Sequence, residues 1–490
     1  MNMQTPIVPA IDRSFSAPRD LLIGGAWRTS DGDRRFPVFN PVDESVLVEI
    51  ADASEADALR AVDAAEAAQP AWGATAPRHR GEILRRAFER MIADRERLAR
   101  LITLENGKSL RDALAEVDYA AEFFRWFSEE AVRASGQTLR APSGAADILV
   151  WLQPVGVCLL ITPWNFPAAM ATRKIGPALA AGCACVLKPA AETPLTALAI
   201  AEILLEAGAP PGVVNVVTTR RSGPVVSAML NHRAVRKLSF TGSTQIGRLL
   251  LAQAAERIVN CSMELGGDAP LLVFDDADLD LAVDGAMIAK MRNGGQACTA
   301  ANRLYVQKGV FATFAEKFAA KMAALRMGDG LAPGVDLGPL VNKKAQSAMR
   351  AFVDLATARG GEIVVGGAAP PGAGCFFPAT VLTQGDRREL VDDEVFGPIA
   401  PIMRFDDADE AIARANAVDY GLVAYVFTRD VGKGLAVCRR LETGMVALNR
   451  GVVSDPAAPF GGVKQSGLGR EGGHEGLLAF LESKYVSIPG

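Results

Sequence analysis

Histidine is scarce in this chain, and the few histidines lie far apart. The 490 residues contain three, His79, His232 and His474, and no CxxC or HExxH pattern brings any of them beside another metal ligand. The G-x-S-x-G elbow of serine hydrolases is absent as well. The sequence therefore predicts no metal site, and the general base for any nucleophilic chemistry is expected to be a carboxylate.

Long apolar runs, an excess of basic charge and a spaced cysteine framework are also lacking. No apolar run approaches the roughly 18 residues of a membrane helix, and the first residues have no apolar core of a signal peptide. A net charge of −4 argues against a nucleic-acid binder. The seven cysteines are an odd set without regular spacing, which favours free thiols in a reducing compartment. We expect a cytoplasmic protein with no nucleic-acid or membrane partner.

The order of predicted elements is strongly α/β, and the length exceeds what one hydrophobic core usually organises. Residues 54–133 predict helices, and an apolar run at 147–162 predicts strands. Strands and helices then alternate: 155–162, 167–181, 184–188, 194–207, 213–218, 223–231, 236–240 and 244–256. This alternation predicts a parallel sheet with a ligand site at the carboxyl ends of its strands. A second α/β succession runs from about 269 to 467.

One cysteine differs from the other six in its surroundings. Cys298 lies in Asn293-Gly-Gly-Gln-Ala-Cys-Thr-Ala-Ala-Asn302, where two glycines and polar neighbours leave the backbone open. A reactive thiolate and an oxyanion hole both need such N–H donors. The alternative is a buried structural thiol. Glu264, between an apolar segment and a Gly pair, is the best candidate for the base, with a helix cap or a paired surface acid as the alternative.

Two glycine patterns suggest phosphate binding. Gly467-Leu-Gly-Arg-Glu-Gly472 matches the dinucleotide pattern G-x-G-x-x-G, but 490 − 472 leaves only 18 residues for the rest of a βαβ unit. We therefore interpret it as a turn-rich loop. Gly242-Ser243 follows a predicted strand and opens a helix, where N–H groups and a hydroxyl can face a pyrophosphate. A glycine N-cap without a ligand is the alternative at that position.

Seven motifs then occur in one order along the chain: Pro163-Trp-Asn-Phe-Pro167, Lys188-Pro189, Phe240-Thr-Gly-Ser243, Glu264-Leu-Gly-Gly267, Gly295-Gln-Ala-Cys298, Glu394-Val-Phe-Gly-Pro398 and Pro459-Phe-Gly-Gly462. Together they resemble the aldehyde dehydrogenase superfamily from about Leu21 to Val486. The interval from Glu264 to Cys298, 298 − 264 = 34 residues, is similar to the family's usual spacing.

The resemblance implies a covalent mechanism. Cys298 is expected to add to an aldehyde carbon and to carry a thiohemiacetal and then a thioester. The Asn165 amide and the Cys298 N–H are expected to hold the oxyanion. Glu264 is expected to activate the water that hydrolyses the thioester. Lys174 matches a lysine near that proton path, with a role as a helix-face cation as the alternative.

The implied cofactor is NADP or NAD. The expected cofactor-binding residues are Thr162, Pro163, Trp164, Asn165, Lys188, Ala190, Ala191, Gly242, Ser243, Leu265, Glu394 and Phe396. Family members that prefer NAD often carry a glutamate three residues after the lysine that matches Lys188. This chain has Ala191 there, and the acid is displaced to Glu192. The sequence therefore favours NADP, with use of both cofactors left open.

The substrate is expected to be a small anionic semialdehyde. The segments around Arg173, Arg292 and Ser454 are similar to the succinate-semialdehyde dehydrogenases of the family, in which such residues grip the distal carboxylate. Two guanidinium groups suit a planar carboxylate, although surface ion pairs on helices are the alternative. Ala300 stands where many relatives have a second cysteine, so no redox-switch disulfide is expected.

Other functions remain open. The Asp455-Pro456 step differs from the common pattern, which keeps glutarate semialdehyde and sulfolactaldehyde as alternative substrates. Retention of Glu264 speaks against a CoA-acylating or phosphorylating relative. A non-catalytic binding or structural paralogue is expected to lose Cys298, Glu264 or Asn165, and this chain has all three.

The resemblance also implies an architecture. A Rossmann-like cofactor domain is expected at 1–133 and 154–265, and an α/β catalytic domain at 266–467. A small β oligomerisation element is expected at 134–153 and 468–490. The expected assembly is a homodimer or homotetramer.

Overall fold

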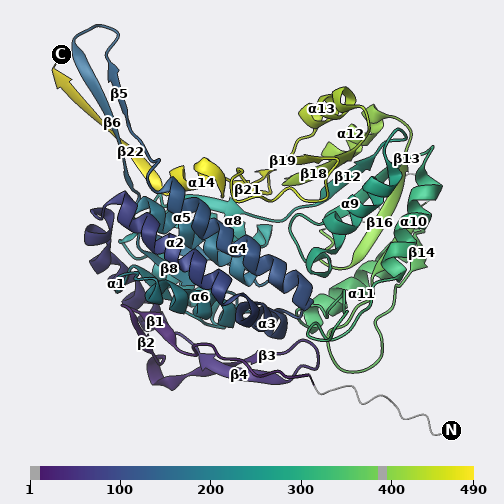
Figure 1. The fold of residues 1–490 in the computed structure, drawn as a ribbon, viewed down its shortest axis with the longest axis horizontal. Coiled ribbons are helices and arrows are strands. Elements are labelled where there is room, and N and C mark those ends of the chain that lie inside the picture. Colours follow the sequence, from purple (N-terminus) through teal and green to yellow (C-terminus); the bar gives the residue numbers. More distant parts are fainter. Residues whose placement is uncertain (1–10, 385–393, 490) are drawn as a thin grey trace.

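The computed structural model describes residues 11–384 and 394–489. Within them, two large sheets each carry helices, and a three-stranded arm with the C-terminal strand projects from the body (Figure 1). Both large sheets consist mainly of parallel strands with helices packed on them, so the α/β fold class predicted from the sequence is confirmed.

The first sheet has the strand order β2-β1-β9-β8-β7-β10-β11-β21. Its strands are β1 (Leu21–Ile23), β2 (Ala26–Arg28), β7 (Val157–Ile161), β8 (Cys185–Lys188), β9 (Val214–Val216), β10 (Val235–Thr241), β11 (Asn260–Glu264) and β21 (Gly467–Leu468). The strands from β9 to β11 are parallel. From β7 the chain proceeds outward through β8 and β9, then returns to β10 and β11 on the other side. The strand order therefore reverses between β7 and β10, where open α/β sheets bind their ligands.

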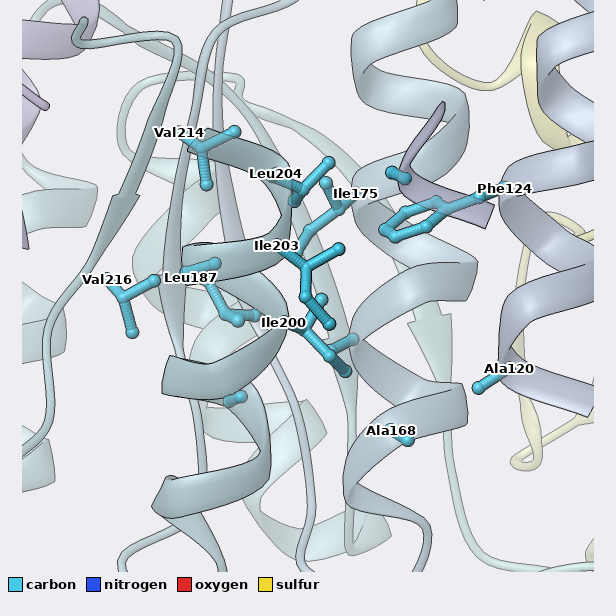
Figure 2. Close-up of a cluster of buried hydrophobic side chains, with 14 of the residues drawn as sticks. Ala120, Phe124, Ala168, Ile175, Leu187, Ile200, Ile203, Leu204, Val214 and Val216 are labelled. Carbon is cyan, nitrogen blue, oxygen red and sulfur yellow. The ribbon is translucent and has the colours of Figure 1, made fainter. Parts of the chain in front are cut away.

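Helices cover both faces of this sheet. The buried side chains of one face come from α2 (Pro77–Ala93), α3 (Arg95–Asn106), α4 (Leu110–Glu130), α5 (Pro167–Ala181) and α6 (Pro194–Glu206). The other face packs against α1 (Glu55–Gly73), α7 (Ser222–Leu230) and α8 (Thr244–Ala255). Figure 2 shows the first core, in which Ile200 and Leu204 of α6 lie between the strand residue Leu187 and Ile175 of α5. This packing fixes where α5 begins, directly after the loop that holds Asn165.

Two buried glutamates cap helices of this layer from a distance in sequence. Glu116 on α4 accepts hydrogen bonds from the first N–H groups of α5, at 2.9 Å from Ala168 and 3.3 Å from Ala169. Glu105 does the same for α6, at 2.7 Å from the Leu195 nitrogen. A carboxylate at a helix N-terminus satisfies orphan donors and complements the dipole. Both caps therefore hold the helices that follow the ligand-facing loops.

The second sheet has the order β14-β15-β16-β13-β12-β18-β19, with only β14 antiparallel to its neighbour. Its strands are β12 (Ala269–Val273), β13 (Ala301–Gln307), β14 (Glu362–Val365), β15 (Thr380–Gln384), β16 (Ile399–Phe405), β18 (Val423–Phe427) and β19 (Met445–Leu448). The accompanying helices are α9 (Leu279–Met291), α10 (Phe311–Ala323), α11 (Lys343–Ala358), α12 (Ala408–Asn416) and α13 (Val431–Arg440). The turn before β13 carries Cys298.

The projecting arm consists of β5 (Gln137–Arg140), β6 (Ala146–Pro154) and β22 (Leu481–Pro489) (Figure 1). β22 follows α14 (Gly473–Leu478) and pairs with β6 along its whole length, from Leu481↔Pro154 to Pro489↔Ala146. The arm leaves large apolar side chains in solvent, with Trp151 53% and Tyr485 62% exposed. The remaining elements are β3 (Arg35–Phe39), β4 (Val46–Ala51), β17 (Tyr420–Gly421), β20 (Val463–Lys464) and the short 3₁₀ turns Asp31–Asp33 and Arg292–Gly295.

The predicted alternation of strands and helices agrees with the observed elements. The helices predicted at 167–181 and 244–256 are α5 and α8, which end within one residue of the predicted positions. Among the described residues, no helix is both long enough and apolar enough to cross a membrane.

Candidate active site

The carboxyl ends of four parallel strands meet at one edge of the first sheet. β7 leads into the Asn165 loop, β8 ends at Lys188, β10 leads to Gly242, and β11 ends at Glu264. A cavity of about 800 Å³ opens at this edge. All twelve residues expected to bind the cofactor line it, together with Cys298: Thr162, Pro163, Trp164, Asn165, Lys188, Ala190, Ala191, Gly242, Ser243, Leu265, Glu394 and Phe396.

Left-handed backbone in three consecutive residues shapes the turn that presents Cys298. Asn293, Gly294 and Gly295 have φ values of 51°, 60° and 76°. A Cβ on Gly295 would lie 2.1 Å from the carbonyl oxygen of Gly397, so only glycine fits there. The glycine pair is therefore needed for the shape of the loop, which brings the partly exposed Cys298 to the cavity.

A network of hydrogen bonds joins the Asn165 loop to the Cys298 loop. The Asn165 amide donates to the carbonyl of Gln296 at 3.2 Å, and the Asn293 amide donates to the carbonyl of Asn165 at 2.7 Å. The ammonium of Lys108 donates to that same carbonyl at 2.8 Å and pairs with Glu116 at 2.5 Å. Both side chains of this pair are completely buried. One hydrogen-bond network thus connects Asn165, the proposed oxyanion donor, with the loop that carries Cys298, the proposed nucleophile.

Burial dominates the electrostatics of the two reactive groups. It raises the pKa of the Cys298 thiol to about 12, although the nearby Arg173 charge opposes the shift. Burial also raises the pKa of Glu264 well above its usual range, and the negative charge of Glu471 adds to the effect. The thiol is therefore protonated at neutral pH and needs a base. A carboxyl with a raised pKa suits that task better than an ordinary glutamate.

Gly461 gives Glu264 room beside the sheet. A Cβ at Gly461, where φ is 156°, would lie 2.8 Å from Glu264 Oε1. The other oxygen, Oε2, is buried and has no hydrogen-bond partner among the described residues. Such an orphaned carboxylate oxygen has an acceptor position for a water or for a proton of the substrate adduct.

Lys174 and Arg173 converge on a carboxylate from a distant segment. Lys174 Nζ lies 2.5 Å from Glu471 Oε1 and 2.9 Å from the Ser239 hydroxyl. Arg173 Nε lies 2.8 Å from Glu471 Oε2 and packs over the Phe460 ring at 4.2 Å. Burial alone raises the pKa of Glu471, but the two cations outweigh it and lower the pKa. Lys174 is therefore a buried ion-pair partner beside Glu264 and does not lie on an exposed helix face.

The three residues expected to bind a substrate carboxylate gather around Tyr119 of α4. The Tyr119 hydroxyl lies beside Ser454 and the Arg173 guanidinium, within the electrostatic reach of Arg292. Arg292 stacks over the Phe166 ring at 5.5 Å and has no acid within ion-pair distance in the described part of the chain. The two arginines thus differ: Arg173 forms an ion pair with Glu471, whereas Arg292 has no ion-pair partner among the described residues.

One detail of the cofactor side differs from the sequence expectation. The Gly242 N–H, expected to face a pyrophosphate, donates instead to the carbonyl of Glu264 at 3.0 Å. Parallel pairing of β10 and β11 continues one residue past the strands and takes up this donor. Ser243 caps α8 by accepting from the Ile246 N–H at 3.4 Å.

The remaining cavity residues carry charge suited to an anionic ligand. Lys188 is buried, which lowers the pKa of its ammonium to about 8, and Arg220 lines the same cavity. Burial raises the pKa of Glu394 to about 8, and its carboxyl accepts the Gly267 N–H at 3.2 Å. The buried Thr241 hydroxyl and Gln253 carbonyl oxygen have no partner among the described residues. Unsatisfied polar groups and two cations in a cavity at the switch point of the sheet suit the phosphate groups of a dinucleotide.

Several residues of the site gave no usable signal in the sequence. Glu471 lies inside the glycine pattern that we interpreted as a turn-rich loop, but that interpretation holds only in part, because Gly467 and Leu468 form β21 and Glu471 makes an isolated β-bridge with Phe460. Tyr119, Lys108 and Glu116 lie on or before α4 in an ordinary amphipathic pattern. Only the fold brings them to the site. The i, i+3/i+4 spacing marked α4 as a helix but could not show that its buried face meets the Asn165 loop.

The described residues contain one group of potential metal ligands, formed by Asp63, Glu66 and His232 at the surface. None of the three lines the cavity. His232 accepts the Ala234 N–H through Nδ1 at 3.2 Å, so its Nε2 carries the proton when the ring is neutral and faces Asp63 at 3.2 Å. This arrangement is complete as a hydrogen-bonded pair without an ion.

Comparison with known proteins matches residues 27–486 to the aldehyde dehydrogenase family. A succinate-semialdehyde dehydrogenase of Paenarthrobacter nicotinovorans is 51% identical over 90% of this chain and 99% of its own length. A glutarate-semialdehyde dehydrogenase of Pseudomonas aeruginosa is 47% identical, covering 96% and 97% of the two chains. A 3-sulfolactaldehyde dehydrogenase of Pseudomonas putida is 46% identical, covering 96% of each.

Solved structures give the same similarity in three dimensions. An NADP-dependent enzyme of Escherichia coli superimposes with a TM-score of 0.95 at 46% identity, over 97% of this chain and 98% of that one. A betaine aldehyde dehydrogenase of Staphylococcus aureus in complex with NAD+ gives a TM-score of 0.93 at 35% identity, over 96% and 95%.

Proposed function

Because this chain belongs to the aldehyde dehydrogenase family, we propose that it oxidises succinate semialdehyde to succinate with NADP or NAD. The observation that carries the choice of substrate is the group of Arg173, Arg292 and Ser454 around Tyr119, close enough to Cys298 for Arg173 to act on the thiol. A positive, hydrogen-bonding pocket near a nucleophile suits an aldehyde whose other end is a carboxylate.

The proposed first step is the addition of Cys298 to the aldehyde carbon. Its thiol has a high pKa, so Glu264 takes the thiol proton as the C–S bond forms. The carbonyl oxygen of the aldehyde becomes an oxyanion, which accepts hydrogen bonds from the Asn165 amide and the Cys298 N–H. Removal of one such donor costs about 3–4 kcal/mol in other enzymes. The braced contact of Asn165 with Gln296 holds this amide in place before the substrate arrives.

The cofactor supplies a two-electron acceptor when it is bound. Lys188 would hold the adenosine ribose, Glu394 the nicotinamide ribose, and Phe396 would pack beside the ring. Trp164 contacts Phe396 edge to face, with ring centroids 5.4 Å apart, so the two rings form one wall of the cavity.

The last proposed step is hydrolysis of the thioester on Cys298. Glu264 first releases the thiol proton to solvent and then removes a proton from a water molecule. The hydroxide attacks the thioester carbon, the C–S bond breaks, and the acid product passes its proton to the departing thiolate, which leaves the carboxylate and the free thiol. Glu471, held negative by Lys174 and Arg173, stabilises the proton on Glu264 after this transfer. Lys174 thus acts on the base through Glu471 and not by contact with the substrate.

Arg292→Ala should raise KM for succinate semialdehyde strongly and leave KM for butanal nearly unchanged. Arg292 has no acid partner in the described chain, so a substrate carboxylate is the anion that it can bind. A lost charge-assisted hydrogen bond to a desolvated carboxylate costs about 1.5–3 kcal/mol, roughly ten- to hundred-fold in KM. Steady-state kinetics on both aldehydes measure the contrast.

Arg292→Lys serves as the matched variant, because it keeps the charge and removes the planar fork, and should give an intermediate KM. Equal losses on both aldehydes would mean that Arg292 is structural and that the substrate assignment loses its main support.

Two other anionic aldehydes are candidate substrates of the same site. The relatives that act on glutarate semialdehyde and 3-sulfolactaldehyde are almost as similar to this chain as the succinate-semialdehyde enzyme. Comparison of kcat/KM for the three aldehydes decides between them. We place succinate semialdehyde first because of the match to Arg173, Arg292 and Ser454. The non-catalytic alternative is disfavoured because Cys298, Glu264 and Asn165 are all present: Cys298 and Asn165 line the cavity, and Glu264 directly precedes the lining residue Leu265.

The proposed cofactor preference is NADP. Lys188 and Arg220 line the cavity with Ala191, and an acid at 191 would repel a 2′-phosphate there. Ala191→Glu should therefore lower kcat/KM for NADP about ten-fold or more, the cost of about 1.4 kcal/mol or above, and spare NAD. Kinetics with the two cofactors at fixed aldehyde concentration test this. An unchanged NADP/NAD ratio would remove Ala191 from the specificity site.

We also propose that the three-stranded arm joins subunits into a dimer or tetramer in the cytoplasm. Exposed Leu139, Trp151 and Tyr485 on this narrow sheet form apolar surface of the kind that marks interfaces. The proposed domain boundaries follow the sequence expectation of 1–133 and 154–265, 266–467, and 134–153 with 468–490. All seven cysteines are free, which suits a reducing compartment.

A further inference from the structure

Tyr119 is a buried polar residue at the centre of the proposed substrate pocket for which the mechanism above has no use. Its hydroxyl oxygen is inaccessible to solvent and makes no well-formed hydrogen bond with any described residue. Buried hydroxyls are almost always paired, because an unpaired one loses its hydration without compensation. An orphaned hydroxyl beside Arg173 and Ser454, two residues proposed to bind the substrate carboxylate, therefore points to a partner that the ligand brings.

The position of the Tyr119 ring is fixed from two sides. Its ring meets Phe123 edge to face, with centroids 4.9 Å apart and an interplanar angle of 69°. Phe123 in turn lies 5.9 Å from the guanidinium of Arg173. Tyr119 has few rotatable bonds, and one turn of α4 separates it from this neighbour. The hydroxyl is consequently presented to the pocket at little entropic cost.

The charges around the hydroxyl select for an anion. Arg173 and Arg292 are the charged groups that act on it most strongly, and Ser454 lies beside it. Arg173 is partly neutralised by Glu471, whereas Arg292 has no acid partner in the described chain. Burial raises the pKa of the Tyr119 phenol despite both cations, so the group is a protonated donor at neutral pH. A carboxylate placed here would accept from an arginine, a phenol and a serine.

We propose that the Tyr119 hydroxyl is the neutral hydrogen-bond donor of the distal-carboxylate site and determines, with Arg292 and Ser454, the preference for semialdehydes over uncharged aldehydes. This proposal rests on the proposed function and deepens it. Tyr119 would satisfy one carboxylate oxygen while Arg292 takes the charge. A site that leaves a buried hydroxyl unpaired discriminates against a substrate without the carboxylate.

Tyr119→Phe is the direct test, because it removes the hydroxyl and keeps the packing on Phe123. KM for succinate semialdehyde should rise roughly ten-fold or more, as for a lost hydrogen bond to a charged group. KM for butanal should stay the same or fall, and kcat should change less than KM. Calorimetric binding of succinate, which needs no turnover, should weaken by a similar factor. The matched control is Tyr305→Phe, a buried tyrosine in β13 that packs in a separate core with Phe274 and Phe405, which should leave all three quantities unchanged.

Equal effects of Tyr119→Phe on both aldehydes, or no effect on either, would overturn the proposal. Arg292→Ala separates this failure from that of the proposed function. If Arg292→Ala shows the contrast between the aldehydes and Tyr119→Phe does not, Tyr119 alone is excluded. If the unmodified enzyme shows no preference for the semialdehyde over butanal, the proposed substrate is wrong and Tyr119 loses its role with it.

A double-mutant cycle of Tyr119→Phe with Arg292→Ala gives a second measurement. Because both groups are proposed to hold one carboxylate, succinate binding by the double variant should be weakened less than the product of the single effects. Independent, multiplying effects would count against a shared ligand. Thermal unfolding of each variant is compared with that of the unmodified enzyme to identify loss of the fold.

Discussion

Cys298→Ala should reduce turnover on the order of a million-fold, or to the detection limit, the scale observed when a covalent nucleophile is removed. The thiol forms the bond to the aldehyde carbon, and the oxyanion hole alone cannot replace that bond. Binding of the cofactor should stay within a few-fold, because the cavity residues expected to bind the dinucleotide do not include Cys298. Stopped-flow measurement of cofactor reduction and fluorescence titration of the dinucleotide test the two halves of the prediction.

Cys438→Ala is the matched control for this variant. Cys438 is a partly exposed free thiol on α13 that does not line the cavity. It should therefore leave both turnover and binding unchanged. Measurable dehydrogenase activity in Cys298→Ala, above that of a mock purification, would reject Cys298 as the nucleophile.

Cys298 could be singled out from sequence because its setting is local. Two glycines with left-handed backbone lie close to polar residues in the segment 293–302. The shape of the loop therefore follows from its local composition. The alternation of strands and helices was predictable for a similar reason, since period and breakers are local signals. Both predictions needed no knowledge of what packs against the segment.

Tyr119 and Glu471 could not be predicted because their environment is produced by tertiary structure. Glu471 is 297 positions from Lys174 in the chain and meets it only because β21 pairs with β11. The glycine-rich composition around Glu471 predicted a loop, missed the short strand Gly467–Leu468, and carried no information on burial. The Gly242 N–H was also misjudged, since strand pairing with Glu264 was not visible in the sequence. In each case a single polar residue has many possible surroundings, and the fold selects one.

The alternative role of Lys174, that of an exposed helix-face cation, is excluded for the same physical reason. A lysine in the middle of an apparently amphipathic helix is most often an exposed cation. Every residue of α5 is buried, however, because the helix lies between α4 and the sheet. The only inexpensive way to bury an ammonium is to pair it, which Glu471 and Ser239 do. Burial of the whole helix thus places the Lys174 charge inside the protein, next to Glu471.

Glu264→Gln should separate the two halves of the reaction. Formation of the adduct and reduction of the cofactor should proceed once per site, as a burst, and steady-state turnover should fall about 10²–10⁴-fold, the range typical of a lost general base. The amide has nearly the shape of the carboxyl and cannot take a proton from water. The thioester on Cys298 would therefore accumulate, and mass spectrometry of acid-quenched enzyme should find an acyl group on the peptide that contains Cys298.

The pH dependence of turnover tests the role of Glu264 independently. Burial and the Glu471 charge raise the pKa of Glu264, so its basic form is lost as pH falls through that raised value. Turnover of the unmodified enzyme should thus increase with pH well above the usual titration range of a glutamate. The residual turnover of Glu264→Gln should lack this dependence, because its side chain does not titrate.

Glu394→Gln is the informative comparison for Glu264→Gln. It removes another buried carboxyl with a raised pKa, but one that lines the cavity and accepts the Gly267 N–H. It should raise KM for the dinucleotide and leave no trapped thioester. The two glutamate variants would then be impaired in different steps of the reaction, which a general loss of structure cannot produce. A steady rate near that of the unmodified enzyme in Glu264→Gln would exclude Glu264 as the base for deacylation and would place that role on another group.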